Sequence, residues 1–581
     1  MVERLIRNQQ VGGSNPLAGS IVFIIIFLEG GCNMRFIIAE DIAKELGINK
    51  IPEIRNTSTE SGKGDFSSPV GFMFAKELKR KPEEITSYLA QKLSTKEWCE
   101  NVEYKVGFLN VYISTEFLFR YLYNLNEDVI KIAGKYLPQY NKKVQIEYVS
   151  ANPTGPLHVA HGRVAAVGSS LANILRILGI NVTTEFYIND AGEQIKKFAL
   201  SIIERIKEIK GLPSDIDSID GGYKGGYIKD IAYRILDKYP NILDLPLEEA
   251  VKIVQDVGVK LMLEDHRKVL SEYRVIIDVW RSERDIREEG WVKKVIELLG
   301  KKGLTYEKDG ALWLKTTVFG DDKDRVLIKR NGEYTYFAVD IAYHYEKYNR
   351  GFDIVYDIWG SDHYGHIPRM KAAMKGLGIH DEFLQVIIIQ IVKFLINGRP
   401  IKMSKRAGTF TLLSELIDSV GVDAARFYFL MYSPDNSMDF DLDLAVKKSM
   451  DNPVYYVQYA YTRALSLKNK ALSKGLNTPT LEEVRDALSQ YIPTKEEKLL
   501  LLNLADIRYR LTLSAKNLSP HFIVNYSKEL AGMLHTFYQS QRVLDAETDA
   551  ARIFRLALID KFIDVMGTLH DLIGISKQEK M

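Results

Sequence analysis

This chain of 581 residues has few cysteines, few long apolar runs and almost no excess of either charge. The two cysteines, Cys32 and Cys99, are too few for a disulfide framework or a structural zinc site, which favours a reducing cytoplasm. Lysine and arginine number 78 against 76 aspartate and glutamate residues, so the bulk charge identifies no partner. The composition predicts a globular, multidomain protein located in the cytoplasm.

The longest apolar stretch near the start, IVFIIIFL at residues 21–28, is too short to cross a bilayer, so no membrane span is expected. Basic residues before it and EGGC after it imitate an export signal, but Glu29 spoils the cleavage pattern. Met34 as the true start is the alternative. Residues 1–33 are therefore interpreted as a tail or a mis-assigned start.

Three patterns divide the rest of the chain. Residues 34–125 alternate helix-like and strand-like stretches, which predicts a small α+β domain. Residues 140–450 begin with the strand-like KVQIEYV, the turn ANPTGP and a helical apolar stripe, which predicts an α/β domain with a parallel sheet of the Rossmann type. A charged, helical insertion is expected at about residues 195–300, and residues 451–581 predict an all-α domain.

The parallel sheet is expected to resume after the insertion. Three segments have the apolar character of its strands: DRVLIKR, FDIVYDIWG and LQVIIIQIVKFL. The last two are nearly continuous apolar runs, as strands buried on both faces require.

The segment HVAHGR, residues 158–163, lies where the first helix of the sheet begins. Ligands of such sheets bind beyond the carboxyl ends of the strands, and a helix N-terminus offers N–H groups to phosphate. His158 and His161, one helical turn apart, could donate hydrogen bonds to phosphate oxygens, while Gly162 would let the backbone come close. A zinc pair and a merely structural pair are the alternatives, although no third ligand stands at a matching spacing.

A second candidate is NGRPIKMSKRAGTF, residues 397–410, which places Lys402, Lys405 and Arg406 in a loop after a buried strand. A basic loop of this kind can close over a triphosphate and neutralise the departing pyrophosphate. Taken alone, this segment would be interpreted as a run of charged side chains exposed to solvent. The phosphate-ready helix start in the same sheet favours the functional interpretation.

HVAH resembles the HIGH signature and KMSKR the KMSKS signature of class I aminoacyl-tRNA synthetases. Over nearly all of residues 34–581 the chain resembles arginyl-tRNA synthetases, through IEYVSANPTGPLHVAHGR, YFAVDIAYHYEKY, DIWGSDHYGHIPRMKAAM and KMSKRAGTF followed by DAARFYFLMYSPDNSMDFDLDLA. One departure is Ala160, where the family has glycine. Its methyl group would crowd the nucleotide base and puts the tightness of ATP binding in doubt.

The resemblance implies an arginine–tRNA ligase that uses ATP with substrate-bound Mg²⁺, holds no metal of its own and acts as a monomer. Positioning and charge stabilisation suffice for this chemistry, so no covalent nucleophile is needed. The catalytic residues would be His158, His161, Lys402 and Lys405. The ATP-binding residues would be His158, His161, Gly162, Gly360, Asp362, His363, Lys402, Met403, Ser404 and Lys405. A metal cluster of Asp362, His363 and His366 is the alternative for GSDHYGH.

A guanidinium group presents a planar fork of donors and needs carboxylate and hydroxyl acceptors. By resemblance the arginine-binding residues would be Glu147, Ser150, Asn152, His161, Tyr336 and Asp340. Tyr336 and Asp340 would share one face if YFAVD is helical. Such a site would reject lysine without an editing domain, because unfilled acceptors stay desolvated.

The tRNA partner would be tRNA(Arg). By resemblance the C-terminal helical domain reads the anticodon, and the N-terminal domain, with GFLNVYIS and Asn110, touches the tRNA elbow. Tyr455, Tyr459 and Arg463 interleave aromatic and basic side chains that could hold unpaired bases and phosphates, although tyrosines at helical spacing also suit a core.

Two rival functions remain. Another class I synthetase would need features that are missing here, such as zinc-ligating cysteines for the cysteine enzyme or a cationic pocket at Asp340 for the glutamate enzyme. A non-catalytic RNA-binding relative would be expected to lack at least one of the signature histidines and lysines. Family habit also implies that ATP–pyrophosphate exchange requires tRNA.

Overall fold

The computed structural model describes residues 33–50, 52–58, 63–123, 137–401 and 411–581. The chain forms two compact units, each assembled from segments that are distant in sequence. The first unit contains residues 1–127, 467–510 and 532–565, and the second contains residues 128–466, 511–531 and 566–581. The domain boundaries predicted from the sequence stay predictions.

The first unit contains an antiparallel sheet with strand order β1-β2-β4-β3. Strand β4 alternates buried Leu109, Val111 and Ile113 with more exposed neighbours, the pattern of a sheet with one covered face. The elements of the N-terminal part are α3 (Asn33–Leu46), β1 (Arg55–Asn56), β2 (Phe66–Ser68), α4 (Val70–Leu78), α5 (Pro82–Leu93), β3 (Cys99–Lys105), β4 (Phe108–Ile113) and α6 (Thr115–Tyr123).

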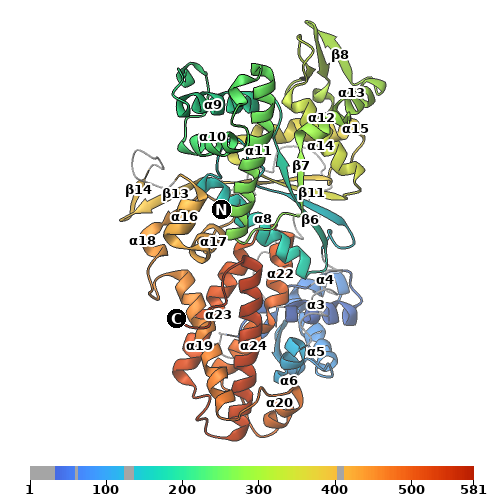
Figure 1. Cartoon of the computed structure of the whole chain (residues 1–581). Helices are drawn as coiled ribbons and strands as arrows, with labels where there is room; N and C mark the ends of the chain where they lie inside the picture. Colours follow the sequence, from blue (N-terminus) through green and yellow to red (C-terminus); the bar gives the residue numbers. More distant parts are fainter. Residues whose placement is uncertain (1–32, 51, 59–62, 124–136, 402–410) are drawn as a thin grey trace. The chain divides into compact units, whose positions relative to one another are not determined.

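The C-terminal part of the chain is helical from residue 453 to residue 573, as predicted (Figure 1). Its helices are α19 (Pro453–Ser473), α20 (Leu481–Leu488), α21 (Lys495–Ala505), α22 (Ile507–Lys516), α23 (His521–Ser540) and α24 (Asp549–Ile573). Within the described residues, no helix combines the length and the apolar character that a bilayer crossing requires.

The second unit is built on a five-stranded, all-parallel sheet with order β12-β11-β5-β6-β7. Its strands are β5 (Lys143–Glu147), β6 (Asn181–Ile188), β7 (Val279–Ser282), β11 (Ile354–Gly360) and β12 (Leu384–Ile389). Helix α8 (Val159–Ile177) connects β5 to β6, and the later strands β11 and β12 add to the opposite side of β5. The strand order therefore reverses between β5 and β11, where ligands of such sheets bind.

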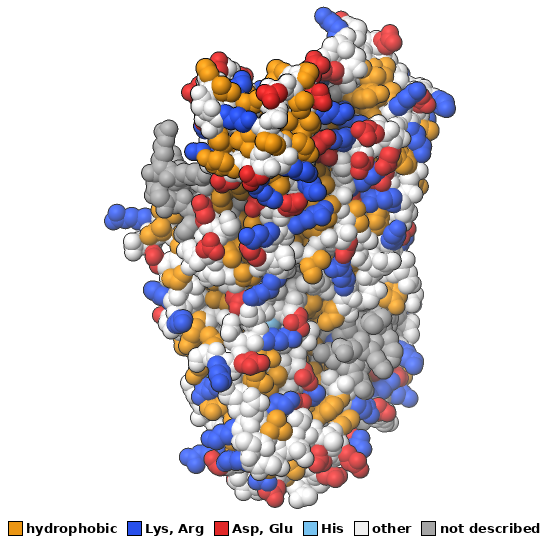
Figure 2. Space-filling view, viewed as in Figure 1, with side chains coloured by type: hydrophobic (Ala, Val, Ile, Leu, Met, Phe, Trp, Pro, Cys, Tyr) orange, Lys and Arg blue, Asp and Glu red, His pale blue; other side chains and the backbone are white. Residues whose placement is uncertain are grey.

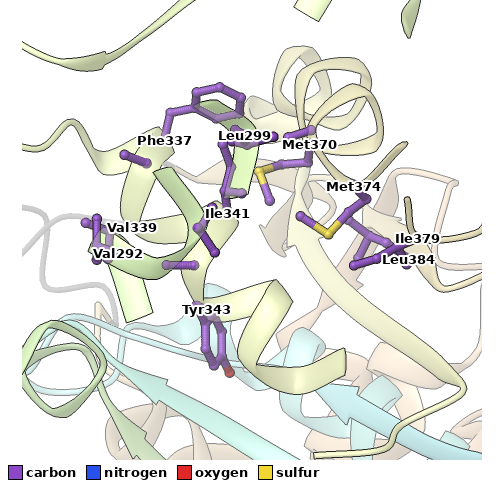
Figure 3. Close-up of a cluster of buried hydrophobic side chains, with 14 of the residues drawn as sticks. Val292, Leu299, Phe337, Val339, Ile341, Tyr343, Met370, Met374, Ile379 and Leu384 are labelled. Carbon is purple, nitrogen blue, oxygen red and sulfur yellow. The ribbon is translucent and has the colours of Figure 1, made fainter. Parts of the chain in front are cut away.

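Helices cover the sheet and fill the insertion. Figure 3 shows one core cluster, in which Phe337, Val339, Ile341 and Tyr343 of one helix lie among side chains from three other segments. The helices after β6 are α9 (Glu193–Ile209), α10 (Gly226–Lys238), α11 (Leu247–Glu272), α12 (Glu283–Glu288), α13 (Trp291–Lys301), α14 (Tyr336–Asn349), α15 (Ile367–Leu377), α16 (Leu413–Val420), α17 (Val422–Leu430) and α18 (Leu442–Ala445).

Figure 2 shows lysine and arginine interspersed with acidic side chains over the visible face, and hydrophobic side chains grouped over α9 to α11.

Two expectations about the sheet are wrong. The predicted insertion ends earlier than expected, because β7 pairs in parallel with β6 as an edge strand of the main sheet. DRVLIKR forms β10 (Arg325–Ile328) not in the main sheet but in a separate antiparallel sheet with β8 (Thr305–Lys308) and β9 (Ala311–Leu314). Pairing partners are tertiary, so a short apolar run cannot show which sheet it joins.

The apolar run LQVIIIQIVKFL is not one strand. It divides at Gln390 into β12 of the main sheet and β13 (Val392–Ile396), which lies in a third sheet with β14 (Arg399–Ile401) and β15 (Met438–Asp441). A continuous hydrophobic run gives no sign of where a chain leaves one sheet for another.

Helix α8 lies close against the chain that follows β5. A β-carbon at Gly168 would be 2.3 Å from the ring of Tyr148, which is buried. Glycine at this position therefore sets how near the helix approaches the sheet.

We expect Gly168→Ala to lower the free energy of unfolding by about 1–3 kcal/mol, because the added methyl group overpacks the Tyr148 contact. Gly226→Ala is the matched control, since Gly226 has no neighbour within 4 Å of an added β-carbon. Urea denaturation of both variants measures the effect. Equal midpoints for the two variants would contradict the packing role of Gly168.

Candidate functional site

A cavity of about 490 Å³ lies at the carboxyl ends of β5 and β11, where the strand order reverses. Its lining includes Glu147 at the end of β5, Ser150 after it, Tyr336 and Asp340 from α14, and Gly360 at the end of β11. These segments are up to about 200 residues apart in sequence, yet four of the predicted arginine-binding residues and two of the predicted nucleotide-binding residues, Gly360 and His363, line this cavity. YFAVD is helical, as the shared-face argument required, because α14 begins at Tyr336.

The histidines of HVAHGR cap helix α8 reciprocally. His158 is the N-cap residue, and its Nδ1 accepts a hydrogen bond from the backbone N–H of Ala160 at 3.2 Å. The Nδ1 of His161 accepts one from the backbone N–H of His158 at 2.9 Å. Both imidazoles must be neutral to accept in this way, so each carries its proton on Nε2.

The electrostatics of the helix tip support this state. Burial, together with the neighbouring His158 and His266 rings, lowers the pKa of His161 to about 4. Partial burial also lowers the pKa of His158. At neutral pH the two rings therefore present Nε2–H donors to a ligand without carrying charge.

The segment that follows the predicted basic loop is fixed to the same helix tip. The backbone N–H of Val159 donates to Thr411 O at 3.0 Å, and the N–H of Leu413 donates to Leu157 O at 2.9 Å. Leu413 also packs on Gly162, where a β-carbon would lie 2.7 Å from its Cδ1. Gly162 is thus required by packing within the protein, which is a different reason from the close nucleotide approach expected for it.

The predicted loop residues themselves, Lys402, Met403, Ser404 and Lys405, lie outside the described residues. Their two flanks are described. The segment starts after Ile401 of β14 and ends at Thr411, whose carbonyl is bonded to the histidine-bearing helix.

A buried charge network forms the floor of the cavity. Lys347 is fully buried, and its Nζ donates to Glu147 Oε2 at 2.6 Å and to Asp357 Oδ1 at 2.9 Å. Burial raises the pKa of Glu147, whereas Lys347 and His344 hold the pKa of Asp357 below its usual range despite its burial. One ammonium group thus bridges two buried carboxylates, and the network can hold Glu147 in place.

The loop after β5 is held by that network. Val149 and Ser150 both have positive φ, at 73° and 40°, which is strained for side chains other than glycine. The Ser150 hydroxyl donates to Glu147 Oε1 at 2.9 Å and accepts from the backbone N–H of Tyr187 at 3.0 Å. Strain at this point indicates a backbone shaped for a ligand.

A carboxylate that sequence reasoning missed lies next to the cavity. Asp340 accepts from His366 Nε2 at 3.0 Å, and the buried Glu283 lies close enough to interact electrostatically with it. Burial, together with the proximity of Asp340, keeps the pKa of Glu283 raised against the opposing effect of Arg287.

Tyr187 is the second missed residue. Its hydroxyl is buried at the cavity, and the Glu283 and Asp340 carboxylates lie near it. Tyr336, by contrast, is 60 % exposed. A buried hydroxyl among carboxylates is the acceptor that a guanidinium group needs.

The remaining predicted nucleotide residues lie around the rim. A β-carbon at Gly360 would be 2.7 Å from the Asp362 carboxylate, so glycine permits the tight turn after β11. Asp362 and His363 are exposed, and His363 lines the cavity. Asn152, also exposed, donates to Gln194 at 3.0 Å and does not line the cavity.

The predicted tRNA residues show geometry suited to bases. Tyr455 and Tyr459 stack with ring centroids 6.0 Å apart, and the Arg463 guanidinium lies 5.9 Å from the Tyr459 ring. All three are half-buried on one face of α19. In β4, Asn110 accepts from the Ser67 hydroxyl at 2.8 Å. These residues remain predictions as RNA contacts.

Three families match successive parts of the chain. Residues 33–113 match the family described as "Arginyl tRNA synthetase N terminal domain", residues 127–429 match "tRNA synthetases class I (R), catalytic domain", and residues 457–581 match "DALR anticodon binding domain". An arginine–tRNA ligase of Oleidesulfovibrio alaskensis is 43% identical over 526 residues, which cover 89% of this chain and 94% of the relative. The chain belongs to the arginyl-tRNA synthetases.

Other comparisons agree with this family. An arginine–tRNA ligase of Caldanaerobacter subterraneus subsp. tengcongensis is 41% identical over 93% of this chain and 96% of its own length. A crystal structure of a Campylobacter jejuni chain, 33% identical, covers 81% of this chain and all of the other with a TM-score of 0.72. The fold also matches the Thermus thermophilus arginyl-tRNA synthetase over 94% of this chain and all of the other, with a TM-score of 0.71 at 24% identity.

The two residues that the sequence analysis missed give little local signal. Glu283 and Tyr187 stand in RSERD and FYIND, segments with no signature of their own. The one local signal is their position at strand ends. Glu283 directly follows β7 and Tyr187 is the second-last residue of β6, and ligands bind at the carboxyl ends of such strands. Assigning β7 to the insertion hid that signal for Glu283.

We expect the stability of the protein to fall between pH 6.5 and pH 4 partly because of His161. Its folded-state pKa lies below the unfolded value, so only the unfolded chain binds the proton in this window. The stabilisation is full above pH 6.5 and is lost as pH falls toward 4. His161→Gln keeps a side-chain acceptor at this cap position but cannot titrate, so its loss of unfolding free energy should be smaller by about 1–3 kcal/mol.

Denaturation of both proteins at pH 7.0 and 4.5 measures the difference. His380→Gln replaces an exposed histidine that follows the C-terminal end of α15, and as the matched control it should lose unfolding free energy as the unmodified chain does. Parallel losses in the unmodified chain and His161→Gln would contradict the burial of a neutral His161.

Proposed function

We propose that the protein activates L-arginine with ATP and then transfers it to the 3′-terminal ribose of tRNA(Arg). The observation that carries this proposal is the meeting of an acid-lined cavity and a donor-bearing helix tip at one edge of the parallel sheet. Both substrates of the first step would bind there. The protein would act in the cytoplasm as a monomer.

In the first step, a carboxylate oxygen of arginine attacks the α-phosphorus of ATP, and the bond to pyrophosphate breaks. The Nε2–H groups of His158 and His161 would donate to phosphate and carboxylate oxygens as their charge shifts. Lys402 and Lys405 would neutralise the departing pyrophosphate. Mg²⁺ would arrive bound to the phosphates of ATP, whose oxygens are ligands it prefers.

The arginine side chain would enter the acidic cavity. The Asp340 and Glu283 carboxylates and the Tyr187 hydroxyl can accept its donors in a planar arrangement, and Tyr336 would cover it from α14. Glu147 and Ser150 lie at the other side of the cavity, near where the α-amino group would sit, with Asn152 on the adjoining loop. In this arrangement the carboxylate of arginine would face the histidine tip.

In the second step, a ribose hydroxyl of tRNA attacks the carbonyl carbon of the adenylate, and AMP leaves. The half-buried stack of Tyr455, Tyr459 and Arg463 would hold unpaired bases of the tRNA, and Asn110 would contact another part of it. The Ala160 methyl group is exposed at the helix tip, next to the position proposed for the nucleotide base.

Charging of total tRNA with each of the twenty amino acids in turn should give stable product with arginine alone. Arginine is expected because the cavity lining contains three carboxylates, Glu147, Asp340 and Asp357, against one arginine, Arg369. Acid-precipitable radioactivity measures the product. Charging with a different amino acid, or tRNA binding without any charging, would refute the proposal and favour a different synthetase or a non-catalytic RNA-binding protein.

Asp340→Asn should raise the KM for arginine by about 10- to 100-fold and change the KM for ATP little, because it removes a charged acceptor from the guanidinium subsite alone. The steady-state charging rate at varied arginine and ATP measures both constants. Asp237→Asn on the exposed face of α10 is the control. An unchanged KM for arginine would exclude Asp340 from the subsite.

A further inference from the structure

Arg163, the last residue of HVAHGR, is fully buried one turn into α8 and makes no contact with the cavity. Its guanidinium donates to three backbone carbonyls: Gln390 O at 2.8 Å, Asn436 O at 2.9 Å and Ser433 O at 3.0 Å. Its Nε has no partner within the described part of the chain. None of the three acceptors is a carboxylate.

A buried arginine with only neutral acceptors is a costly arrangement. Burial lowers the pKa of Arg163 to about 10, with a small opposing effect from Asp435. At such a buried position, a well-packed apolar residue would usually stabilise the folded protein at least as well as an arginine. Arginine offers something that an apolar residue cannot, because its rigid fork fixes several carbonyls at defined angles.

The three carbonyls belong to the two segments that enter the third sheet. Gln390 stands where the chain leaves β12 and continues into β13, and its own N–H donates to Pro434 O at 3.0 Å. Ser433 and Asn436 precede β15, which pairs in parallel with β13. The fork therefore fastens the base of the β13–β14 hairpin to α8.

This hairpin leads in sequence directly into Lys402, while α8 carries His158 and His161 at its tip. Ile401, the last residue of β14, pairs with Phe394 near the base of the hairpin, so a shift of that base would move the start of the basic signature relative to the imidazoles. We propose that Arg163 is a positioning residue for adenylate formation, which sets the register between the helix that bears the histidines and the hairpin that leads to the basic signature. This inference rests on the proposed function.

A second buried arginine on the same side of the sheet supplies a matched control. Arg426 of α17 is also fully buried, and it donates to the carbonyls of Ile573 and Tyr273 and to the hydroxyls of Ser169 and Ser170. It therefore holds the C-terminal half of α8 without contacting the hairpin. The two arginines are alike in burial and in the neutral character of their acceptors.

The test compares Arg163→Lys, Arg163→Gln and Arg426→Lys with the unmodified enzyme. Lysine keeps the charge but lacks the planar fork that spans the three carbonyls. ATP–pyrophosphate exchange is measured with arginine and tRNA(Arg) present, at varied ATP and at varied arginine, together with thermal unfolding. Exchange by the unmodified enzyme tests the proposed function itself, so its failure is distinguishable from failure of the inference.

The expected result is a loss of about 10- to 100-fold in kcat/KM for ATP in both Arg163 variants, the size of a misplacement of reacting groups by about 1 Å. The KM for arginine should stay within about twofold, because the acidic cavity is untouched. Arg426→Lys should lose a similar amount of thermal stability but keep kcat/KM for ATP within about threefold.

Three outcomes would overturn the inference. The first is unchanged ATP kinetics in the Arg163 variants. The second is a parallel loss of ATP and arginine kinetics in the Arg163 and Arg426 variants, which would assign both arginines to stability. The third is failure of both Arg163 variants to fold under conditions in which Arg426→Lys folds.

Discussion

The start of helix α8 is the constraint on which the site depends. A helix N-terminus must find acceptors for its first N–H groups, and here the acceptors are the Nδ1 atoms of His158 and His161. That structural requirement determines the chemistry, because an imidazole that accepts at Nδ1 must carry its hydrogen on Nε2. Protonation would break the cap, so the low pKa of His161 and the order of the helix tip support one another. The same residues thereby end the loop after β5 and prepare donors for an anionic ligand.

Charge balance divides the acidic residues of the second unit into two groups. Glu147 and Asp357 share the ammonium group of the buried Lys347. Asp340 lines the cavity and pairs with His366, whereas Glu283 lies next to Asp340 outside the cavity lining and pairs with Arg287. The first group can hold the floor rigid, and the second leaves a negative field for a cationic side chain. A cavity with all its carboxylates paired in this way would have no preference for arginine.

Sequence alone predicted the features that are local and missed those that are tertiary. The helix after HVAHGR and the parallel strands FDIVYDIWG and KVQIEYV follow from periodicity, and the resemblance supplied the family. The split of LQVIIIQIVKFL at Gln390, the separate sheet of β10 and the edge strand β7 depend on pairing partners that no run of residues records. Glu283 and Tyr187 were missed for the same reason, since only the assembled sheet brings Tyr187 to the cavity and Glu283 next to Asp340. Arg163 stood inside the quoted motif, yet its role depends on carbonyls more than 200 residues away.

The geometry also bears on how arginine would be told from lysine. An ammonium group on a chain of similar length could reach one carboxylate of the cavity, but it would leave the other acceptors, the Tyr187 hydroxyl among them, without a donor from the ligand. Those groups stay desolvated when the cavity is filled, and each unmet acceptor costs about 1–3 kcal/mol. Two or three such losses reach the discrimination of roughly 10⁴ at which a hydrolytic second site becomes unnecessary. Specificity in this arrangement comes from the free-energy cost of leaving buried acceptors without a donor.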